Sequence, residues 1–205
     1  MPTTITTEQV KALRDQTGIS IMQCKKALEE AKGDMEKALV ILRKKSGELG
    51  AKKADRTFKA GTIAGYMHAT GRVGSMVELL SESDFVSGSD EFKALARDIA
   101  MHVAATNPKF IRKSDIKESD MTAAKSVFAE EVKGKPASMQ GKPEGMQEKI
   151  LEGKLAGYFG EMVLLDQPFV KNPDVTIQGL IDAAMQKFGE KIDVGRFTRF
   201  AVLEK

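Results

Sequence analysis

RVGSMVELLSESDFV, residues 72–86, is one of the densest apolar runs in the chain, and the neighbouring segments can be interpreted from it. Its β-branched and long apolar side chains, in so short a run, predict a buried strand that ends at Ser81. A polar turn follows, and after it comes Asp84-Phe85-Val86. Ser87 and Asp90 then have the spacing of a capping box, which predicts the start of a helix.

Phe85 is therefore expected on a loop between a strand and a helix. Two interpretations are open: the ring folds back as a lid over the core, or it projects as a wedge, a side chain that inserts into a partner protein. The neighbouring Asp84 favours the wedge, because an unpaired carboxylate is costly to bury. An acid beside an aromatic ring suits a partner site that holds a metal ion or phosphate.

The segments on either side predict an α+β core domain whose antiparallel strands are covered by helices on one face. Upstream, Thr62–His68 predicts a strand that forms a hairpin with the opening stretch through a turn at Ala69–Arg72. Downstream, apolar residues at helical spacing predict a helix that ends near Asn107. The later segments are expected to be a charged helix at Ser119–Val132, a flexible polar arm at Lys133–Lys142, a helix at Glu144–Tyr158, a buried strand at Glu161–Leu165, a helix at Thr176–Phe188 and a closing strand at Gly195–Leu203.

The first part of the chain predicts three short helices that pack as a bundle of roughly 45 residues. Thr6 and Gln9 have capping-box spacing, Gly18 ends the first helix, and Ser20 begins the second. Asp34 is expected to cap the third helix. Ile19, Ile21 and Met22 remain outside the inward stripe, where they form either a docking knob for a partner or an extra edge of the core.

Gly47–Arg56 begins with glycines and continues as a charged run, which predicts a domain boundary. The expected domains are a helical bundle at residues 1–50 and an α+β core at residues 51–205, with a flexible helical arm near 119–143. The basic residues at the boundary have no interleaved aromatic residues, so a nucleic-acid patch is not expected there. Such a run is more often a solvated helix face or a linker.

Composition favours an intracellular globular protein. The chain has 205 residues, 41% of them apolar, and a net charge of +3 that is too small to predict nucleic-acid binding by itself. Cys24 is the single cysteine, which excludes an intramolecular disulfide and favours a reducing compartment. Met1–Thr4 lacks the pattern of a signal peptide and no apolar run approaches membrane-spanning length, so a cytoplasmic location is expected.

The sequence contains none of the residue patterns that covalent catalysis uses. No glycine-rich phosphate loop follows a predicted strand, and the two histidines, His68 and His102, lack the neighbours of a metal site. A nucleophile paired with a base is also absent. We therefore expect a binding protein without a metal or cofactor, and not an enzyme.

Several motifs occur in the order known from one protein family. Ser83-Asp84-Phe85-Val86 is similar to its Thr-Asp-Phe-Val motif, and Leu13-Arg14, Thr17-Gly18 and Met22–Leu28 are similar to its N-terminal signature. Further matches are Ala100–Ala104, Gln167–Val170 and Arg196–Phe200. The chain thus resembles bacterial elongation factor Ts nearly from end to end.

Two positions depart from the family pattern. Ser83 stands where the family usually has Thr, and Gln23 stands where Asp is frequent, which weakens the case for a charge contact at that position. The chain resembles the short form of the family, with one core repeat where longer members have two. The resemblance therefore implies a homodimer, because two copies would supply what a long member carries in one chain.

The resemblance implies a guanine nucleotide exchange factor that binds elongation factor Tu in its GDP-bound and nucleotide-free states. The bundle would have a ubiquitin-associated-like fold and dock through the turn at Ile21-Met22, with Arg14 nearby. Ser83, Asp84, Phe85 and Val86 would lie beside the Mg²⁺ and phosphate site of the GTPase and displace the ion. Val73, Gly74 and His102 match family positions that meet the partner.

A second interpretation is a ubiquitin-associated-like binding module fused to an RNA- or ribosome-contacting domain, which the basic linker suggests. Its binding would fall steeply with salt and would not respond to GDP. The exchange-factor interpretation, in contrast, expects no direct contact with nucleic acid. Neither interpretation involves a membrane.

Overall fold

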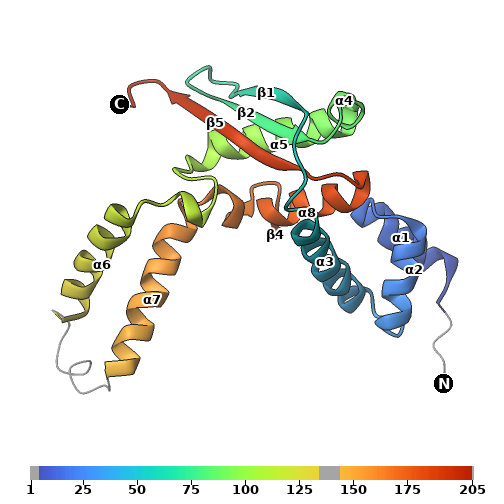
Figure 1. The fold of residues 1–205 in the computed structure, drawn as a ribbon, viewed down its shortest axis with the longest axis horizontal. Coiled ribbons are helices and arrows are strands. Elements are labelled where there is room, and N and C mark those ends of the chain that lie inside the picture. The colour runs from blue at the N-terminus through green and yellow to red at the C-terminus, as the bar shows by residue number, and fades with distance from the viewer. Residues whose placement is uncertain (1–4, 134–143, 205) are drawn as a thin grey trace.

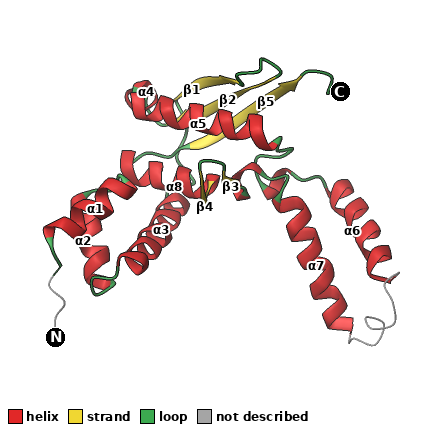
Figure 2. Ribbon diagram, turned by 180° about the vertical axis from the view of Figure 1, so that it is seen from behind, coloured by secondary structure: helices red, strands yellow, loops and turns green. Residues whose placement is uncertain are grey.

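The predicted hairpin forms part of a three-stranded antiparallel sheet in the computed structural model, which describes residues 5–133 and 144–204 (Figure 1). β1 (Ala60–Met67) pairs with β2 (Val73–Ser81), and the other edge of β2 pairs with β5 (Asp193–Ala201). Side chains of β2 alternate along this stretch: Val77 and Leu79 face inward, while Met76, which precedes Val77, faces outward. Helices cover one face of this sheet (Figure 2), so the predicted α+β class is confirmed.

The main core lies between the sheet and two helices, α5 (Asp90–Thr106) and α8 (Ile177–Phe188). α5 packs directly against β1 and β2. Its expected end is confirmed, because Asn107 adopts a left-handed conformation there and caps the helix through its backbone N–H. The largest fully buried side chains of this core are Leu79, Phe92, Ile99, Leu164, Ile177, Ile181 and Ile192.

The N-terminal bundle consists of α1 (Thr7–Thr17), α2 (Ile21–Glu30) and α3 (Met35–Lys52). Its predicted helix starts are confirmed: Thr6 and Gln9 form a reciprocal capping box, and Ser20 and Asp34 accept backbone N–H bonds from the residues three positions later. Gly18, with φ of 67°, ends α1 as expected. The bundle has its own core, made of Val10, Leu13, Ile19, Cys24, Ala27, Leu28, Ala31, Ala38 and Leu42.

α3 continues through the glycines that were expected to begin a linker, so that interpretation of Gly47 and Gly50 is wrong. The helix extends to Lys52 and packs against α8. A Cβ added to Gly50 would lie 2.9 Å from Cε of Met185, so the missing side chain lets α3 approach α8 closely. The glycines serve helix packing here, and the division into domains at residues 1–50 and 51–205 stays a prediction.

α6 (Glu118–Lys133) and α7 (Glu144–Gly160) form the two predicted helices that flank the polar arm. They lie side by side and project from the core at the end opposite the bundle (Figures 1 and 2). The ring of Phe128 meets that of Tyr158 edge to face, with centroids 5.4 Å apart. The predicted arm at Lys133–Lys142 lies outside the described residues beyond Lys133. No helix within the described ranges has both the length and the apolar character needed to cross a bilayer.

The strand predicted at Glu161–Leu165 is absent, and this prediction is wrong. The segment contains one isolated bridge, from Val163 to Phe110, followed by the 3-10 helix η2 (Leu164–Asp166). Val163, Leu164 and Leu165 are buried, so the apolar run predicted their burial correctly but not the backbone conformation. The sequence analysis also missed the 3-10 helix η1 (Lys113–Asp115) and the short hairpin of β3 (Pro168–Phe169) and β4 (Asn172–Thr176).

Candidate functional site

Phe85 lies on a short helix, α4 (Asp84–Gly88), and not on the loop that the sequence predicted. Ser83 begins this helix, because its Oγ accepts a hydrogen bond from the N–H of Val86 at 3.4 Å. The predicted capping box of Ser87 and Asp90 is also wrong, since Ser89 is the residue that caps α5. Two capping serines six positions apart leave room for one separate helical turn, and Ser87 is buried within it.

The side chain of Phe85 is 87% exposed, whereas that of Val86 is 4% exposed. Consecutive residues on a helix point about 100° apart, so at the edge of the buried face one side chain can face the core while the next faces solvent. Val86 packs into that core and fixes the turn, while Asp84 is exposed beside the ring. The ring does not fold back over the core, and the lid interpretation is wrong.

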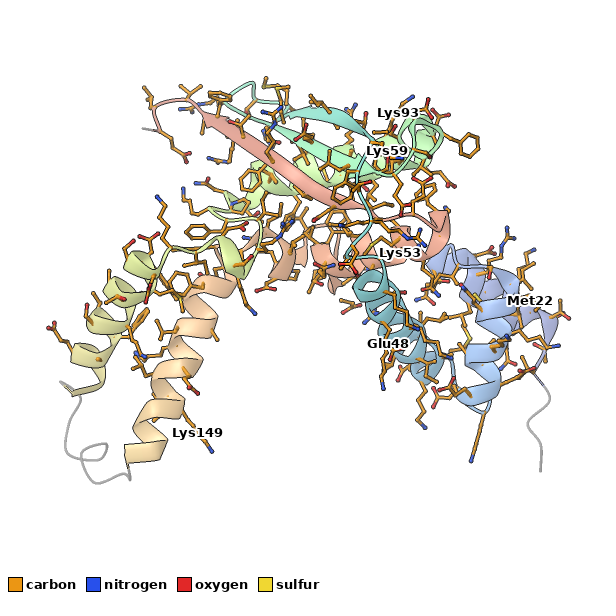
Figure 3. All side chains as sticks on the ribbon, viewed as in Figure 1. Met22, Glu48, Lys53, Lys59, Lys93 and Lys149 are labelled. Atoms are coloured by element: carbon orange, nitrogen blue, oxygen red, sulfur yellow. The ribbon has the colours of Figure 1, made fainter. Side chains whose placement is uncertain are left out.

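A second group of exposed apolar side chains lies at the first turn of α2. Ile21 is 57% exposed and Met22 is 67% exposed, and Met22 points away from the bundle (Figure 3). Ile19, by contrast, is buried in the bundle core, so for this residue the core alternative is correct and the docking alternative is wrong. Ile19 precedes the cap at Ser20, outside α2, and its side chain joins the core of the bundle. Arg14, near the end of α1, is exposed.

α4 and the first turn of α2 lie at the same end of the molecule (Figures 1 and 2). The C-terminal part of α8 contacts both the first turn of α2 and the start of α5, the helix that follows α4. Nε2 of Gln186 donates to Oε1 of Gln23 on α2 at 3.0 Å, and Lys187 pairs with Glu91 at the start of α5 at 2.8 Å. Gln23, the residue that departs from the family pattern, therefore joins the bundle to the core through an uncharged hydrogen bond.

Val73 and Gly74 lie at the opposite end of β2 from α4. A nine-residue strand spans about 30 Å, so these residues cannot share one small contact patch with Phe85. Gly74 pairs with Phe200 on β5, and a Cβ on Gly74 would lie 3.1 Å from the terminal methyl group of Met67. Ser75 donates to the carbonyl of Ala100 on α5, which brings this end of the strand close to His102.

His102 is completely buried. Its Nδ1 accepts a hydrogen bond from the backbone N–H of Val170 at 3.3 Å, and its Nε2 lies 2.8 Å from Oε1 of Gln167. A backbone amide can only donate, so Nδ1 carries no proton and Nε2–H donates to Gln167. Burial lowers the pKa of this imidazole, which favours the neutral form that the two hydrogen bonds require.

The buried ring of His102 leaves no surface for direct contact in this structure. It holds the segment that runs from Gln167 to Val170, and Val170 is itself exposed. Any contribution of His102 to partner binding would therefore pass through that segment. The predicted partner-binding residues thus fall into two regions, one around α4 and α2 and the other around the start of β2 and the end of α5.

Within the described ranges, no group of three or more His, Cys, Asp or Glu side chains is placed to hold a metal ion. The sequence analysis missed one residue that contacts the start of α4. The carboxylate of Glu190 accepts hydrogen bonds from Glu82 and Ser83, which precede it by more than a hundred positions. No local pattern could have indicated this contact, because it depends on how β5 follows α8 in three dimensions.

Comparison with known proteins gives one consistent result. A family model described as "Elongation factor TS" matches residues 4–204. Proteins named "Elongation factor Ts" from Carboxydothermus hydrogenoformans and Koribacter versatilis are 44% and 46% identical to the chain, over 98% and 97% of its length and 90% and 88% of theirs. The protein of that name from Thermodesulfovibrio yellowstonii is 46% identical over 97% of this chain and 96% of its own.

Proposed function

The chain belongs to the elongation factor Ts family and is a translation elongation factor, and from this premise we propose that it promotes the release of GDP from elongation factor Tu. In this role it makes and breaks no covalent bond. It acts in the cytoplasm by binding the GTPase in its GDP-bound and nucleotide-free states. The observation that carries the proposal is the exposed ring of Phe85 on a helical turn whose next residue is anchored in the core.

Phe85 and Asp84 supply the chemistry of the exchange step in this proposal. Mg²⁺ neutralises the phosphates of bound GDP, so a side chain that displaces the ion or its ligands weakens nucleotide binding. The apolar ring gives the shape that enters the site, and the Asp84 carboxylate adds a negative charge beside the ion. A tenfold faster release requires only about 1.4 kcal/mol off the barrier, which is within the range of one well-placed side chain.

Binding of the factor and of the nucleotide is reciprocal. If the factor weakens GDP binding to the GTPase by some ratio, GDP weakens binding of the factor by the same ratio. The factor must therefore hold the GTPase through contacts that do not depend on the nucleotide. We assign this docking to Ile21 and Met22, which are exposed at the first turn of α2, with Arg14, which is exposed near the end of the preceding helix. Met22 lies at the same end of the molecule as α4 (Figure 3).

Val73, Gly74 and His102 would belong to a second region of contact at the other end of β2. In this proposal Val73 and Gly74 lie at the end of the sheet that meets the partner, and His102 contributes by fixing the Gln167–Val170 segment. Two separated regions give a broader footprint than one. They also let the docking contacts persist while the nucleotide site is opened.

A homodimer is part of the same proposal, and the outer face of the sheet supports it. This face carries large apolar side chains from all three strands that remain exposed in the single chain: Ile63, Met67, Met76 and Phe200. A contiguous exposed apolar patch is typical of an interaction site. Sedimentation velocity tests this part, and a chain that stays monomeric at micromolar concentration would contradict it.

The proposed activity is tested by stopped-flow fluorescence with elongation factor Tu that carries a fluorescent GDP. The expected result is a release rate that rises with the concentration of the factor and then saturates. A pull-down with and without excess GDP provides a second readout, in which GDP should reduce capture of elongation factor Tu. Capture that is indifferent to GDP and falls steeply with salt would favour the RNA- or ribosome-contacting alternative.

A further inference from the structure

Glu190 lies just beyond α8, after Gly189, which ends the helix with φ of 74°. Its carboxylate accepts hydrogen bonds from the two residues that lead into α4. Oε2 accepts from the backbone N–H of Glu82 at 3.1 Å and from that of Ser83 at 3.0 Å. Oε1 accepts from the hydroxyl of Ser83 at 2.5 Å. One half-buried carboxylate thus fixes the backbone and the side chain of the residue that caps α4.

The two segments are also joined in the reverse direction. Oε1 of Glu82 accepts a hydrogen bond from the backbone N–H of Lys191 at 2.5 Å and another from the guanidinium of Arg56 at 3.1 Å. The Lys191 hydrogen bond is the main reason that the pKa of Glu82 is lowered. Residues 82–83 and 190–191 are therefore bonded reciprocally, and each segment supplies both donors and acceptors.

Cations surround the two carboxylates. Lys191 donates its Nζ to the carbonyl oxygens of Ala54 and Arg56, which adds the segment between α3 and β1 to the network. Lys53 is buried nearby: burial lowers the pKa of its ammonium group, and the charges of Glu82 and Glu190 oppose that lowering. Positive charge thus lies near Glu190, whose carboxylate serves as the acceptor of three hydrogen bonds.

α4 needs such a support, because a helix of five residues is not stable by itself. Two features hold it: Val86 is buried in the core, and Ser83 caps the first turn. The hydroxyl of Ser83 accepts from the N–H of Val86 while it donates to Glu190, so the carboxylate fixes the same oxygen that begins the helix. The direction in which Phe85 projects is set at this residue.

We propose that Glu190 is a positioning residue for nucleotide exchange: through its three hydrogen bonds to Glu82 and Ser83 it aims Phe85 at the partner. This inference rests on the proposed function. Glu190 has no contact with the GTPase in this scheme and acts only through α4. Because Gln186, four positions earlier, bonds to the bundle, the end of α8 also fixes the docking turn and the wedge relative to one another.

The test is a double-mutant cycle of Glu190→Ala and Phe85→Ala, read by the maximal rate of fluorescent GDP release and by the concentration of factor that gives half of it. In the otherwise unchanged protein, Glu190→Ala should lower the maximal rate about tenfold, because small misplacements of a reacting group are costly. The half-saturating concentration should change by less than about threefold, because the docking residues are intact. In the Phe85→Ala background the same change should have almost no further effect.

Two further variants separate positioning from simple loss of structure. Glu190→Gln keeps a carbonyl oxygen that can accept from both backbone N–H groups, so it should restore much of the maximal rate. Glu36→Ala removes an exposed carboxylate from the first turn of α3 and serves as the matched control with an unchanged rate. If thermal unfolding shows that Glu190→Ala does not fold, Glu190→Gln replaces it in the double-mutant cycle. It should then lower the maximal release rate by less than about tenfold in the otherwise unchanged protein, and have almost no effect in the Phe85→Ala background.

The outcomes distinguish the inference from its premise. If Phe85→Ala slows release but Glu190→Ala does not, the inference is wrong and the proposed function stands. If the two substitutions have additive effects, Glu190 acts elsewhere than through Phe85, which also overturns the inference. If Phe85→Ala leaves the rate unchanged, the proposed wedge is wrong and the positioning role falls with it.

Discussion

Phe85 and Val86 are consecutive residues of α4, yet the phenylalanine ring is exposed to solvent and the valine side chain is buried in the core. The valine holds the helical turn in place, and the ring is free to contact another molecule. An exposed aromatic ring on a rigid turn loses little conformational entropy when it binds, which suits a side chain that must enter a confined site.

Substitution of the two residues should therefore have different consequences. Phe85→Ala should reduce the maximal rate of GDP release by at least about tenfold, while affinity for elongation factor Tu and thermal stability change little. Val86→Ala should lower the free energy of unfolding by about 2 kcal/mol, because it removes buried apolar surface. Stopped-flow kinetics and chemical denaturation measure the two effects. An unchanged release rate in Phe85→Ala would remove the ring from the mechanism.

Met22 should contribute to docking and not to the exchange step. Met22→Ala is expected to weaken complex formation by about 1 to 2 kcal/mol, a roughly five- to thirtyfold higher dissociation constant, through the loss of apolar contact area. The maximal release rate at saturating factor should be unchanged. Isothermal titration calorimetry with nucleotide-free elongation factor Tu measures the affinity.

The matched control for Met22 is Val40→Ala. Val40 is an equally exposed apolar residue of the same bundle, on α3, and its replacement should leave the affinity as it was. Equal affinities for wild type and Met22→Ala would show that the exposed turn of α2 has no part in binding.

His102 should make stability depend on pH. Its pKa is lowered in the folded protein from the ordinary value of about 6.5, so the unfolded chain binds the proton more readily than the native protein does. The contribution is complete above about pH 6.5 and is lost as pH falls from there through the folded pKa. Melting temperatures of the wild type should accordingly fall between pH 7 and pH 5.

The contribution of His102 can be separated from that of the carboxylates by substitution. His102→Gln should be less stable overall and should lack part of the decrease between pH 7 and pH 5. His68→Gln, in which an exposed histidine of the β1–β2 turn is replaced, should retain the full decrease. Identical pH profiles for all three proteins would mean that the buried imidazole does not titrate in this range.

The outer face of the sheet should be required for self-association. Phe200→Glu places a charge on an exposed position of β5, so it should leave the fold stable but oppose burial of that face against a second copy. Sedimentation velocity should then show a monomer where the wild type sediments as a dimer. Val40→Glu, on the equally exposed surface of α3, should remain dimeric, and a dimer in both variants would locate the interface elsewhere.

Much of the local structure could be predicted from short-range patterns. The capping box of Thr6 and Gln9, the serine cap at Ser20 and the hairpin formed by β1 and β2 each depend on residues a few positions apart, and the structure has them where the sequence placed them. The motif Ser83-Asp84-Phe85-Val86 could likewise be recognised in the sequence. For Met22 the sequence allowed two alternatives, an exposed docking residue or an edge of the core, and could not decide between them.

The remaining features depended on contacts between distant parts of the chain. Glu161–Leu165 has the composition of a buried strand, but its carbonyl and N–H partners lie at Phe110 and Ile111, and it folds as a bridge and a 3-10 turn. Gly50 belongs to a stretch with the composition of a linker, but Met185 of α8 packs against it. In both cases the residue types were compatible with two conformations, and the packing partner selected one.

The sequence by itself thus determined the α+β class, the family and the positions of most helix ends, because capping and strand alternation are governed by interactions within one or two turns of the chain. Only the tertiary structure decided which side of α4 faces solvent, that His102 is buried and neutral, and that Glu190 holds Ser83 from 107 positions away. Burial and long-range hydrogen bonds exist only after the chain has folded, so patterns within a few residues could not decide the structure at these sites.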